Sequence, residues 1–346
     1  MKGNIIVGQS GGPTAAINSS LAGVYRTAID RGAKKVYGMR HGIQGLLNED
    51  YIDLSEHIQT DLDVELLKRT PATYLGSCRY KLPEIHEDIA TYDKIFSILD
   101  KLEIECFIYI GGNDSMDTIK KLSDYAILRG HPTKFLGVPK TIDNDLALTD
   151  HTPGYGSAAK YIGTSVKEII QDSQALIYDK GLVTIVEIMG RNAGWLVGAA
   201  ALSKGEDCDG PDLIYVPELP FDIDNFLVRI KELLAEKTFV VVAVSEGIRL
   251  ADGRYVCELT DGVDFVDAFG HKQLTGTANY LARRLAQEIG CKTRTIELSS
   301  MQRAASHLAS RIDILEAFQV GGAAVKAADE GDTGEMVIIK RLSDDP

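Results

Sequence analysis

The sequence predicts an α/β protein with a doubly wound parallel sheet, divided into two lobes. Six short apolar runs rich in β-branched residues indicate strands buried on both faces, at residues 4–7, 106–110, 135–138, 183–188, 213–216 and 239–244. Amphipathic stretches with helical periodicity alternate with them, at residues 15–31, 89–102, 115–128, 158–171, 223–234 and 278–289. The length of 346 residues exceeds the size at which a single core usually divides, so two lobes are expected.

The composition is typical of a soluble cytoplasmic enzyme. Hydrophobic residues make up 45% and charged residues 25% of the chain, and the formal net charge is −13. Because nucleic-acid backbones are bound by excess lysine and arginine, this charge argues against such a partner, but not against a small anion held by a few focused cations. The five cysteines are scattered without metal-ligand spacing, as reduced thiols are, and no signal peptide or membrane span is predicted.

The first candidate site segment covers residues 5–17, IIVGQSGGPTAAI. A predicted strand runs into Gly11 and Gly12, and a helix is expected to begin near Thr14. Backbone N–H groups of such a turn, together with the positive end of the helix dipole, favour a bound anion. A plain tight turn is the alternative interpretation, since the segment matches neither of the common glycine-rich nucleotide-binding motifs.

The second segment covers residues 107–118, FIYIGGNDSMDT, in which a buried strand ends in two glycines and polar residues follow at once. Ligands of open α/β sheets bind beyond the carboxyl ends of strands, so Asn113, Asp114 and Ser115 are expected where a ligand would lie. Ser115 is also a reasonable helix N-cap. The alternative is that Asp114 merely caps that helix.

The third segment, residues 135–145, ends another apolar strand at Pro139 and continues with Lys140, Thr141, Asp143 and Asp145. The last three side chains would point the same way if the backbone stays extended. Two carboxylates beside a lysine and an anion-binding turn are the parts of a phosphoryl-transfer site, namely a base, a metal ligand and a cation for the phosphates.

These segments, the third of which contains PKTIDND at 139–145, and five further motifs resemble the phosphofructokinase family over essentially the whole chain. The further motifs are EIMGR at 187–191, LGSCR at 75–79, VSEG at 244–247, TRT at 293–295 and MQR at 301–303. The resemblance implies two similar Rossmann-like lobes with the active site in the cleft between them. It predicts a phosphoryl-donor lobe at 1–145 completed by about 250–305, and a fructose 6-phosphate lobe at 146–250 completed by about 306–346.

The resemblance also implies the reaction, transfer of a phosphoryl group to the 1-hydroxyl of fructose 6-phosphate in glycolysis and gluconeogenesis. Asp143 looks like the general base, and Thr141 and Arg191 like groups that stabilise the transferred phosphoryl. The expected donor-binding residues are Gly12, Arg79, Gly112 and Ser115. The sugar phosphate is expected at Thr141, Asp143, Met189, Gly190, Arg191, Glu246, Arg294, Ser300, Met301, Gln302 and Arg303. The implied cofactor is Mg²⁺, with Asn113 and Asp145 as its protein ligands.

Asp114 and Lys140 predict pyrophosphate as the donor. ATP-using members of the family typically have glycine where Asp114 stands, and often glycine where Lys140 stands. Two like charges about 4 Å apart at an effective dielectric of about 20 repel by roughly 4 kcal/mol, so Asp114 would disfavour the α-phosphate of ATP. Pyrophosphate has no third phosphate to repel, and Lys140 supplies a cation for it.

The chain departs from the family pattern in four places. Asn113 replaces a usual acidic residue, Leu182 a common arginine, Ser300 a common histidine or tyrosine, and Ala304-Ala305 a usual glycine pair. Two alternatives therefore stand beside the main hypothesis, an ATP-dependent phosphofructokinase and a non-catalytic regulatory subunit. The resemblance further implies a homodimer or homotetramer, in which Arg294 serves a neighbour's sugar-phosphate site.

Overall fold

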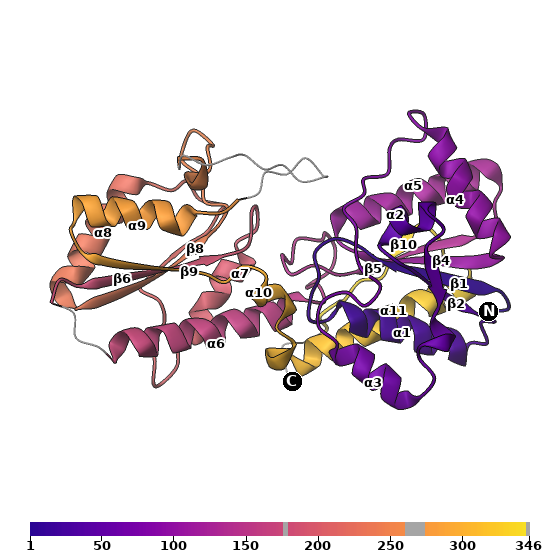
Figure 1. Ribbon diagram of the computed structural model, residues 1–346, viewed down its shortest axis with the longest axis horizontal. Coiled ribbons are helices and arrows are strands. Elements are labelled where there is room, and N and C mark those ends of the chain that lie inside the picture. Colours follow the sequence, from indigo (N-terminus) through magenta and orange to yellow (C-terminus); the bar gives the residue numbers. More distant parts are fainter. Residues whose placement is uncertain (176–178, 260–273, 344–346) are drawn as a thin grey trace. The chain divides into compact units, whose positions relative to one another are not determined.

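The computed structural model describes residues 1–175, 179–259 and 274–343, which form two compact units (Figure 1). Unit 1 consists of Met1–Ser157 and Arg303–Pro346, and unit 2 of Ala158–Gln302. The chain therefore passes from unit 1 to unit 2 and back once.

Unit 1 is built on a six-stranded sheet in the order β10-β5-β4-β1-β2-β3, parallel except for the pair β2–β3. Its strands are β1 (Asn4–Gln9), β2 (Val36–Met39), β3 (Tyr51–Asp53), β4 (Ile104–Gly111), β5 (Lys134–Pro139) and β10 (Glu335–Met336). Its helices are α1 (Ile17–Asp30), α2 (Gly42–Leu47), α3 (Asp61–Arg69), α4 (Ile89–Lys101), α5 (Asn113–Arg129) and α11 (Arg311–Glu330).

Strand β1 shows why this sheet carries a core on each face. Ile5 and Val7 pack into one hydrophobic cluster with residues of α1, α3 and α11, whereas Ile6 packs into another with residues of α2, α4 and α5. Successive side chains of a strand point to opposite faces, so a continuous apolar run is what a sheet covered on both sides requires. Figure 1 shows these two groups of helices on opposite sides of the strands.

Unit 2 is a smaller version of the same architecture. Its sheet has four parallel strands in the order β7-β8-β6-β9, namely β6 (Leu182–Ile188), β7 (Leu213–Tyr215), β8 (Phe239–Ser245) and β9 (Lys292–Glu297). Its helices are α6 (Tyr155–Gln174), which begins in unit 1, with α7 (Trp195–Gly198), α8 (Ile223–Glu236), α9 (Thr277–Glu288) and α10 (Met301–Ala304). Apolar residues of α8 and α9 pack on one face of the sheet, and α6 lies on the other (Figure 1).

The predicted fold class is confirmed, but the segments that complete the units differ from the prediction. Residues 250–302 belong to unit 2 because β9 pairs with β6, and residues 303–346 belong to unit 1 because α11 packs against α1. Glycines allow this close helix contact: a Cβ at Gly23 would lie 1.9 Å from the carbonyl oxygen of Phe318. The first crossing also falls at 157–158 rather than at 145–146.

All six predicted strands and all six predicted helices are present, with ends shifted by a few residues. Four strands were missed, and the reason is visible in β9. Its sequence KTRTIE is charged and alternates, and its residues are exposed or half-buried because it lies at the edge of its sheet. Helix α11 was also missed, since three alanines and two glycines weaken its apolar periodicity between residues 317 and 325.

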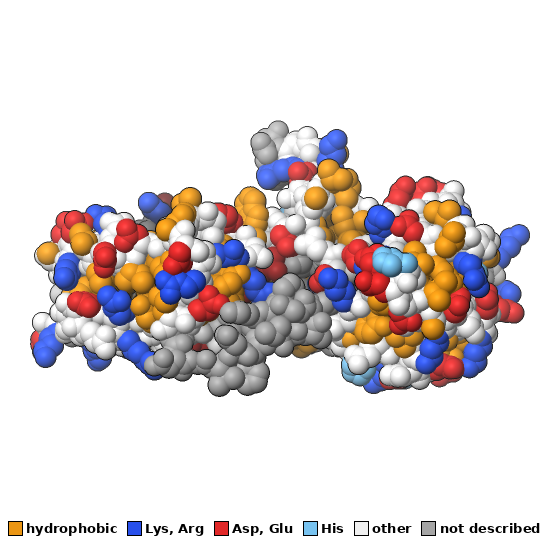
Figure 2. Space-filling model, turned by 90° about the horizontal axis from the view of Figure 1, so that it is seen from above, with side chains coloured by type: hydrophobic (Ala, Val, Ile, Leu, Met, Phe, Trp, Pro, Cys, Tyr) orange, Lys and Arg blue, Asp and Glu red, His pale blue; other side chains and the backbone are white. Residues whose placement is uncertain are grey.

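Charged side chains of both signs are interspersed on the faces of the units seen in Figure 2. With a net charge of −13, a phosphate-binding site in this protein requires cations gathered locally. Among the described residues, no helix has the length and apolar character needed to cross a bilayer.

Candidate active site

The three candidate segments of unit 1 meet at one edge of its sheet. Strands β1, β4 and β5 are adjacent and parallel, so their carboxyl ends lie at the same edge. The backbone N–H of Ser10 donates to the carbonyl of Ile110 at 2.9 Å, and that of Lys140 donates to Gly111 at 3.0 Å. The hydroxyls of Ser115 and Ser10 are 2.9 Å apart. The structure thus brings the three segments together, as predicted.

Lys140 is buried behind the glycine turn. The residue is only 3% exposed, and its Nζ donates a 2.8 Å hydrogen bond to the carbonyl oxygen of Gly12. A Cβ added at Gly12 would lie 3.4 Å from Nη1 of Arg303, so a second cation stands beside the same residue. Burial, helped by the charges of Arg303 and Arg79 and opposed by that of Asp143, lowers the pKa of Lys140 to about 8. Lys140 and Arg303 therefore lie at the Gly11-Gly12 turn, and the charge of Arg79 acts on Lys140.

Lys121 shows what a buried lysine looks like in a structural role. It is 7% exposed, and its Nζ lies 2.8 Å from carboxylate oxygens of both Glu84 and Asp117. Burial lowers the pKa of Lys121, but these two hydrogen-bonded carboxylates more than offset the effect and raise it to about 12. Lys140 has one carboxylate, that of Asp143, and two cations, Arg303 and Arg79, as electrostatic neighbours, and an anionic ligand would relieve the repulsion among the cations.

Asp143 lies in a turned loop, not in an extended segment. Its backbone N–H donates to Oγ1 of Thr141 at 3.1 Å, and the next residue, Asn144, has a φ of +54°. The backbone therefore does not stay extended, and the condition under which Thr141, Asp143 and Asp145 would point the same way is not met. Asn144 tolerates this left-handed conformation, and its Oδ1 accepts a 2.9 Å hydrogen bond from the backbone of Thr152. The loop is thus held by its own later residues.

Asp114 and Asn113 begin α5 beside Asp145. Nδ2 of Asn113 donates to Oδ2 of Asp145 at 2.9 Å. Asp145 is an exposed residue, but partial desolvation of its carboxyl group raises its pKa. The hydrogen bond from Asn113 opposes this rise, and the negative charge of Asp114 adds to it. Asp114 thus lies in the first turn of α5, next to Asn113, and its negative charge acts on Asp145.

The capping interpretations of this segment are wrong. The N-cap of α5 is Gly112, and no side chain accepts a hydrogen bond there. Ser115 is the third residue of the helix, and its 3% exposed hydroxyl contacts Ser10 instead. Asp114 is an exposed acidic residue in the first turn, so its presence is not explained by a side-chain cap.

In unit 2, the ends of β6 and β8 bring together part of the predicted sugar-phosphate set. The N–H of Gly190 donates to Oε1 of Glu246 at 3.4 Å, and the N–H of Met189 donates to Oε1 of Gln302 at 3.2 Å. The carbonyl of Arg191 passes so close to Gly247 that a Cβ there would lie 2.0 Å from it. Next to Gln302, which is 1% exposed, Met301 and Ser300 are exposed.

Arg294 does not join that group within this chain. Arg294 pairs in register with Thr184 of β6. Thr184 lies four residues, or about 13 Å along the strand, before Ile188, the last residue of β6. Its guanidinium contacts Asp172 of α6 at 2.7 Å. This place fits the expectation that Arg294 serves another subunit, which stays a prediction.

Sequence reasoning missed supporting residues in both units. Oγ of Ser77 donates to the carbonyl of Gly11 at 2.6 Å, which ties the LGSCR motif to the glycine turn. Glu187 of the EIMGR motif is 5% exposed and accepts a 2.8 Å hydrogen bond from the N–H of Ala278 at the start of α9. Burial, helped by the charges of Glu297 and Glu246 and opposed by this hydrogen bond, raises the pKa of Glu187 to about 7. Both residues lie inside motifs that carry the family resemblance, Ser77 in LGSCR and Glu187 in EIMGR, and this position was the one indication of their role.

Within the described part of the chain, His, Cys, Asp and Glu side chains form no group of three that could hold a metal ion. Asp145 is a carboxylate ligand of the kind that Mg²⁺ takes, with phosphate oxygens and water filling the other positions. Asn113 presents its nitrogen to Asp145, so in this arrangement it holds the carboxylate in place instead of adding an oxygen ligand. These residues fit a magnesium ion shared with a phosphorylated ligand.

The fold and the edge of unit 1 define an α/β protein with cations around a glycine turn and carboxylates opposite them, which is the arrangement of a phosphoryl-transfer enzyme. The phosphofructokinase family model matches residues 4–328, and this chain belongs to that family. The predicted family membership is confirmed.

Relatives of known name agree with this assignment. A pyrophosphate–fructose 6-phosphate 1-phosphotransferase of Xanthomonas campestris pv. campestris is 43% identical over 99% of this chain and 81% of its own length. The crystal structure of a pyrophosphate-dependent phosphofructokinase from Nitrosospira multiformis superimposes with a TM-score of 0.87 at 34% identity, covering 99% of this chain and 80% of that one. An ATP-dependent 6-phosphofructokinase 3 of Streptomyces coelicolor is 31% identical, covering 96% and 89%.

Proposed function

We propose that this protein transfers a phosphoryl group reversibly from pyrophosphate to the 1-hydroxyl of fructose 6-phosphate. The products are fructose 1,6-bisphosphate and phosphate. The observation that carries the choice of donor is the acidic residue Asp114 in the first turn of α5, whose charge acts on Asp145 at the strand edge where Lys140 contacts the glycine turn. The names of the Xanthomonas and Nitrosospira relatives support the same donor.

Asp143 acts as the general base in the proposed reaction. It takes the proton from the sugar 1-hydroxyl while that oxygen bonds to phosphorus, and the bridging P–O bond of pyrophosphate breaks to release phosphate. Thr141 and Arg191 stabilise the charge that develops on the transferred group. The Oγ1 of Thr141 accepts a hydrogen bond from the backbone N–H of Asp143, which ties the Thr141 side chain to the backbone that carries the base.

The donor phosphates bind at the Gly11-Gly12 turn. Lys140, Arg79 and Arg303 supply positive charge there, and Gly112 and Ser115 border the turn through the Ser10 contact. Arg303 has a second proposed role, since its guanidinium stands beside Gly12 although the family resemblance assigns it to the sugar phosphate. An arginine fork suits either phosphate because its geometry matches two phosphate oxygens.

The sugar phosphate binds to unit 2 in this proposal, through Met189–Arg191, Glu246 and the segment 300–302, with Arg294 acting in a neighbouring subunit of a homodimer or homotetramer. The hydrogen bonds of Gly190 to Glu246 and of Met189 to Gln302 support a preformed surface. Mg²⁺ would be held by Asp145, with Asn113 orienting that carboxylate, and would neutralise charge on the pyrophosphate. A cytoplasmic location completes the proposal.

Activity of the purified protein with each donor tests this function. Turnover of fructose 6-phosphate is expected with pyrophosphate in both directions and not with ATP at the same concentration. Turnover with ATP alone would favour the ATP-dependent alternative, and no turnover with either donor would favour the non-catalytic subunit.

Asp114→Gly is expected to improve the use of ATP. Because Asp114 is exposed, the repulsion of an α-phosphate about 4 Å away lies between roughly 1 kcal/mol, as in water, and roughly 4 kcal/mol, as at a protein surface. The kcat/KM for ATP should therefore rise at least about fivefold while that for pyrophosphate changes less. Asp124→Gly is the matched control, because this exposed residue of α5 pairs with Lys120. An unchanged donor preference in Asp114→Gly would refute the charge argument.

A further inference from the structure

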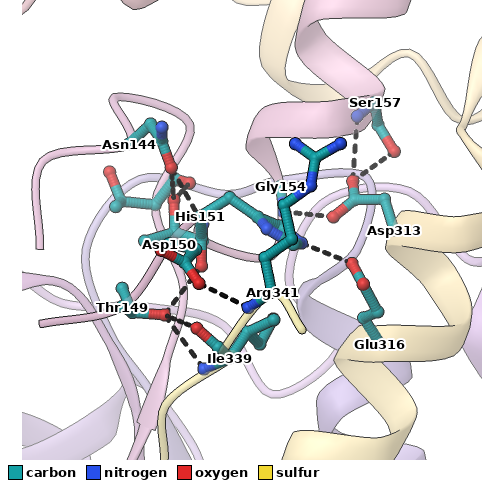
Figure 3. A network of polar contacts seen from close by, with 12 residues as sticks. Asn144, Thr149, Asp150, His151, Gly154, Ser157, Asp313, Glu316, Ile339 and Arg341 are labelled. Carbon is teal, nitrogen blue, oxygen red and sulfur yellow. Dashed lines mark hydrogen bonds and ion pairs between the residues drawn. The ribbon is translucent and has the colours of Figure 1, made fainter. Parts of the chain in front are cut away.

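The carboxylate of Asp313 is buried at the beginning of α6 (Figure 3). Asp313 belongs to α11 and is 3% exposed. Its Oδ1 accepts a 2.8 Å hydrogen bond from the backbone N–H of Gly154. Its Oδ2 accepts from both the N–H and the hydroxyl of Ser157, at 2.9 and 2.5 Å. Burial raises the pKa of Asp313, and the three donors oppose this rise by favouring the carboxylate; an amide side chain could not accept all three hydrogen bonds.

Gly154 connects this carboxylate to the loop of Asp143. It pairs with Thr141 as an isolated parallel bridge. Its φ is +111°, and a Cβ there would lie 3.0 Å from Cγ2 of Thr14 and 3.3 Å from the carbonyl oxygen of Thr141. Gly154 is therefore confined between Thr14, which lies between the glycine turn and α1, and the backbone of the loop.

The residues just before Gly154 hold the loop directly. The N–H of Thr141 donates to the carbonyl of Pro153 at 3.2 Å. Thr152 donates its hydroxyl to the carbonyl of Thr141 at 2.8 Å and its N–H to Oδ1 of Asn144 at 2.9 Å. Residues on both sides of Asp143 are thus bonded to the segment 152–154, and Asp313 fixes the end of that segment.

We infer that Asp313 is a positioning residue, which sets the place of Asp143 and Thr141 through Gly154 and the loop bonds of 152–153. The inference rests on the proposed function and adds a residue that touches neither substrate. Asp313 lies 159 positions after Gly154 in the sequence, and all the contacts that connect it to the loop are within unit 1. Loss of the carboxylate would release the loop and misplace the base by a fraction of an ångström to about 1 Å, which is enough to slow a positioned reaction by roughly 10- to 100-fold.

Asp313→Asn tests the inference, because asparagine has the same shape but presents an N–H₂ group to one of the donors. We expect kcat with pyrophosphate and fructose 6-phosphate to fall roughly 10- to 100-fold at a temperature where the variant is fully folded. The KM for pyrophosphate should stay within about threefold, since the cations around the glycine turn are untouched. A purely structural role predicts a lower Tm with normal kcat, and that result would overturn the inference.

Glu316→Gln is the matched control. Glu316 lies one turn further along α11 and binds the same segment through Nε2 of His151, at 2.6 Å (Figure 3). Its kcat should stay within about threefold of the wild-type value. If Glu316→Gln lowers kcat as much as Asp313→Asn does, the effect is a general loosening of the segment and the inference is wrong.

Ser157→Ala decides the question if Asp313→Asn does not fold. It removes the hydroxyl bond to Asp313, and the acceptor for the N–H of Ser310, but keeps both backbone donors and the charge. A fall in kcat of about fivefold at constant KM for pyrophosphate supports the inference, and an unchanged kcat overturns it. Wild-type protein measured alongside separates the two proposals. An inactive wild type contradicts the proposed function. An active wild type with an equally active variant contradicts only the role of Asp313.

Discussion

Asp143→Asn is expected to lower kcat by about 10²- to 10⁴-fold in both directions of the reaction. The amide has the shape of the carboxylate but cannot accept the proton of the sugar 1-hydroxyl. The local backbone should persist, because the hydrogen bond to Oγ1 of Thr141 comes from the N–H of residue 143 and not from its side chain. Steady-state kinetics with pyrophosphate and with phosphate measure the two directions, and KM values should change much less than kcat.

Asp150→Asn is the control for that experiment. Asp150 is an exposed carboxylate of the same loop, and it accepts a hydrogen bond from the backbone of Arg341 (Figure 3). Its neutralisation should leave kcat within about threefold. If Asp143→Asn keeps more than about a tenth of the wild-type kcat, another group removes the proton and the assignment of the base is wrong.

Lys140→Met is expected to weaken catalysis and stabilise the fold at the same time. The kcat/KM for pyrophosphate should fall by at least about 10²-fold, because a buried cation that faces the donor phosphates is lost. At pH 7 the folded protein carries this lysine charged although burial lowers its pKa from 10.5 to about 8. That difference means that the buried charge destabilises the folded protein by about 3 kcal/mol. Methionine removes this cost but also the hydrogen bond to Gly12, so the free energy of unfolding should rise by about 1–3 kcal/mol.

The pH dependence follows from the same shift. Between pH 8 and 10.5 the unfolded wild-type chain holds a proton on Lys140 that the folded protein has lost, so the free energy of unfolding should rise with pH across this window. Lys140→Met lacks that rise. The kcat/KM of the wild type for pyrophosphate should fall above about pH 8, because it reports the free enzyme, whereas kcat should fall only at higher pH once the bound anion holds the proton on the lysine.

Lys121→Met is the control for Lys140→Met, because it also replaces a buried lysine of unit 1. It leaves the carboxylates of Glu84 and Asp117 without their cation, so the free energy of unfolding should fall while the KM for pyrophosphate is unchanged. Chemical denaturation at pH 7 and steady-state kinetics compare the two variants. A Lys140→Met protein that is less stable than the wild type would show that the lysine is a structural cation like Lys121.

Much of the fold could be predicted because local patterns determine local elements. The apolar runs of β1, β4 and β5 read as strands covered on both faces, and their order along the chain made a parallel sheet the expected arrangement. Parallel strands present their carboxyl ends at one edge, so the meeting of residues 10–12, 112–115 and 140–145 followed from the strand positions alone. The edge strand β9 was missed because half-exposed residues carry no such pattern.

Long-range packing decided which segment completes which unit. Helix α11 returns to unit 1 because Gly23 and Gly321 let it approach α1 closely, a property of two facing surfaces that neither helix reveals in its own sequence. The same helix delivers Asp313 to Gly154 across 159 residues of sequence. No local motif could predict this contact.

The identities of the site residues were present in the sequence, but their chemical states were not. PKTIDND and the glycine turn mark Lys140, Asp143 and Gly12 as candidates by residue type and position in the chain alone. That Lys140 is buried with Arg303 and Arg79 nearby, and so has a lowered pKa, depends on distances between separate segments. The chain fixes the residue types. The interaction energy between two charged side chains depends on their distance in space, so the pKa of each group is set only by the folded structure.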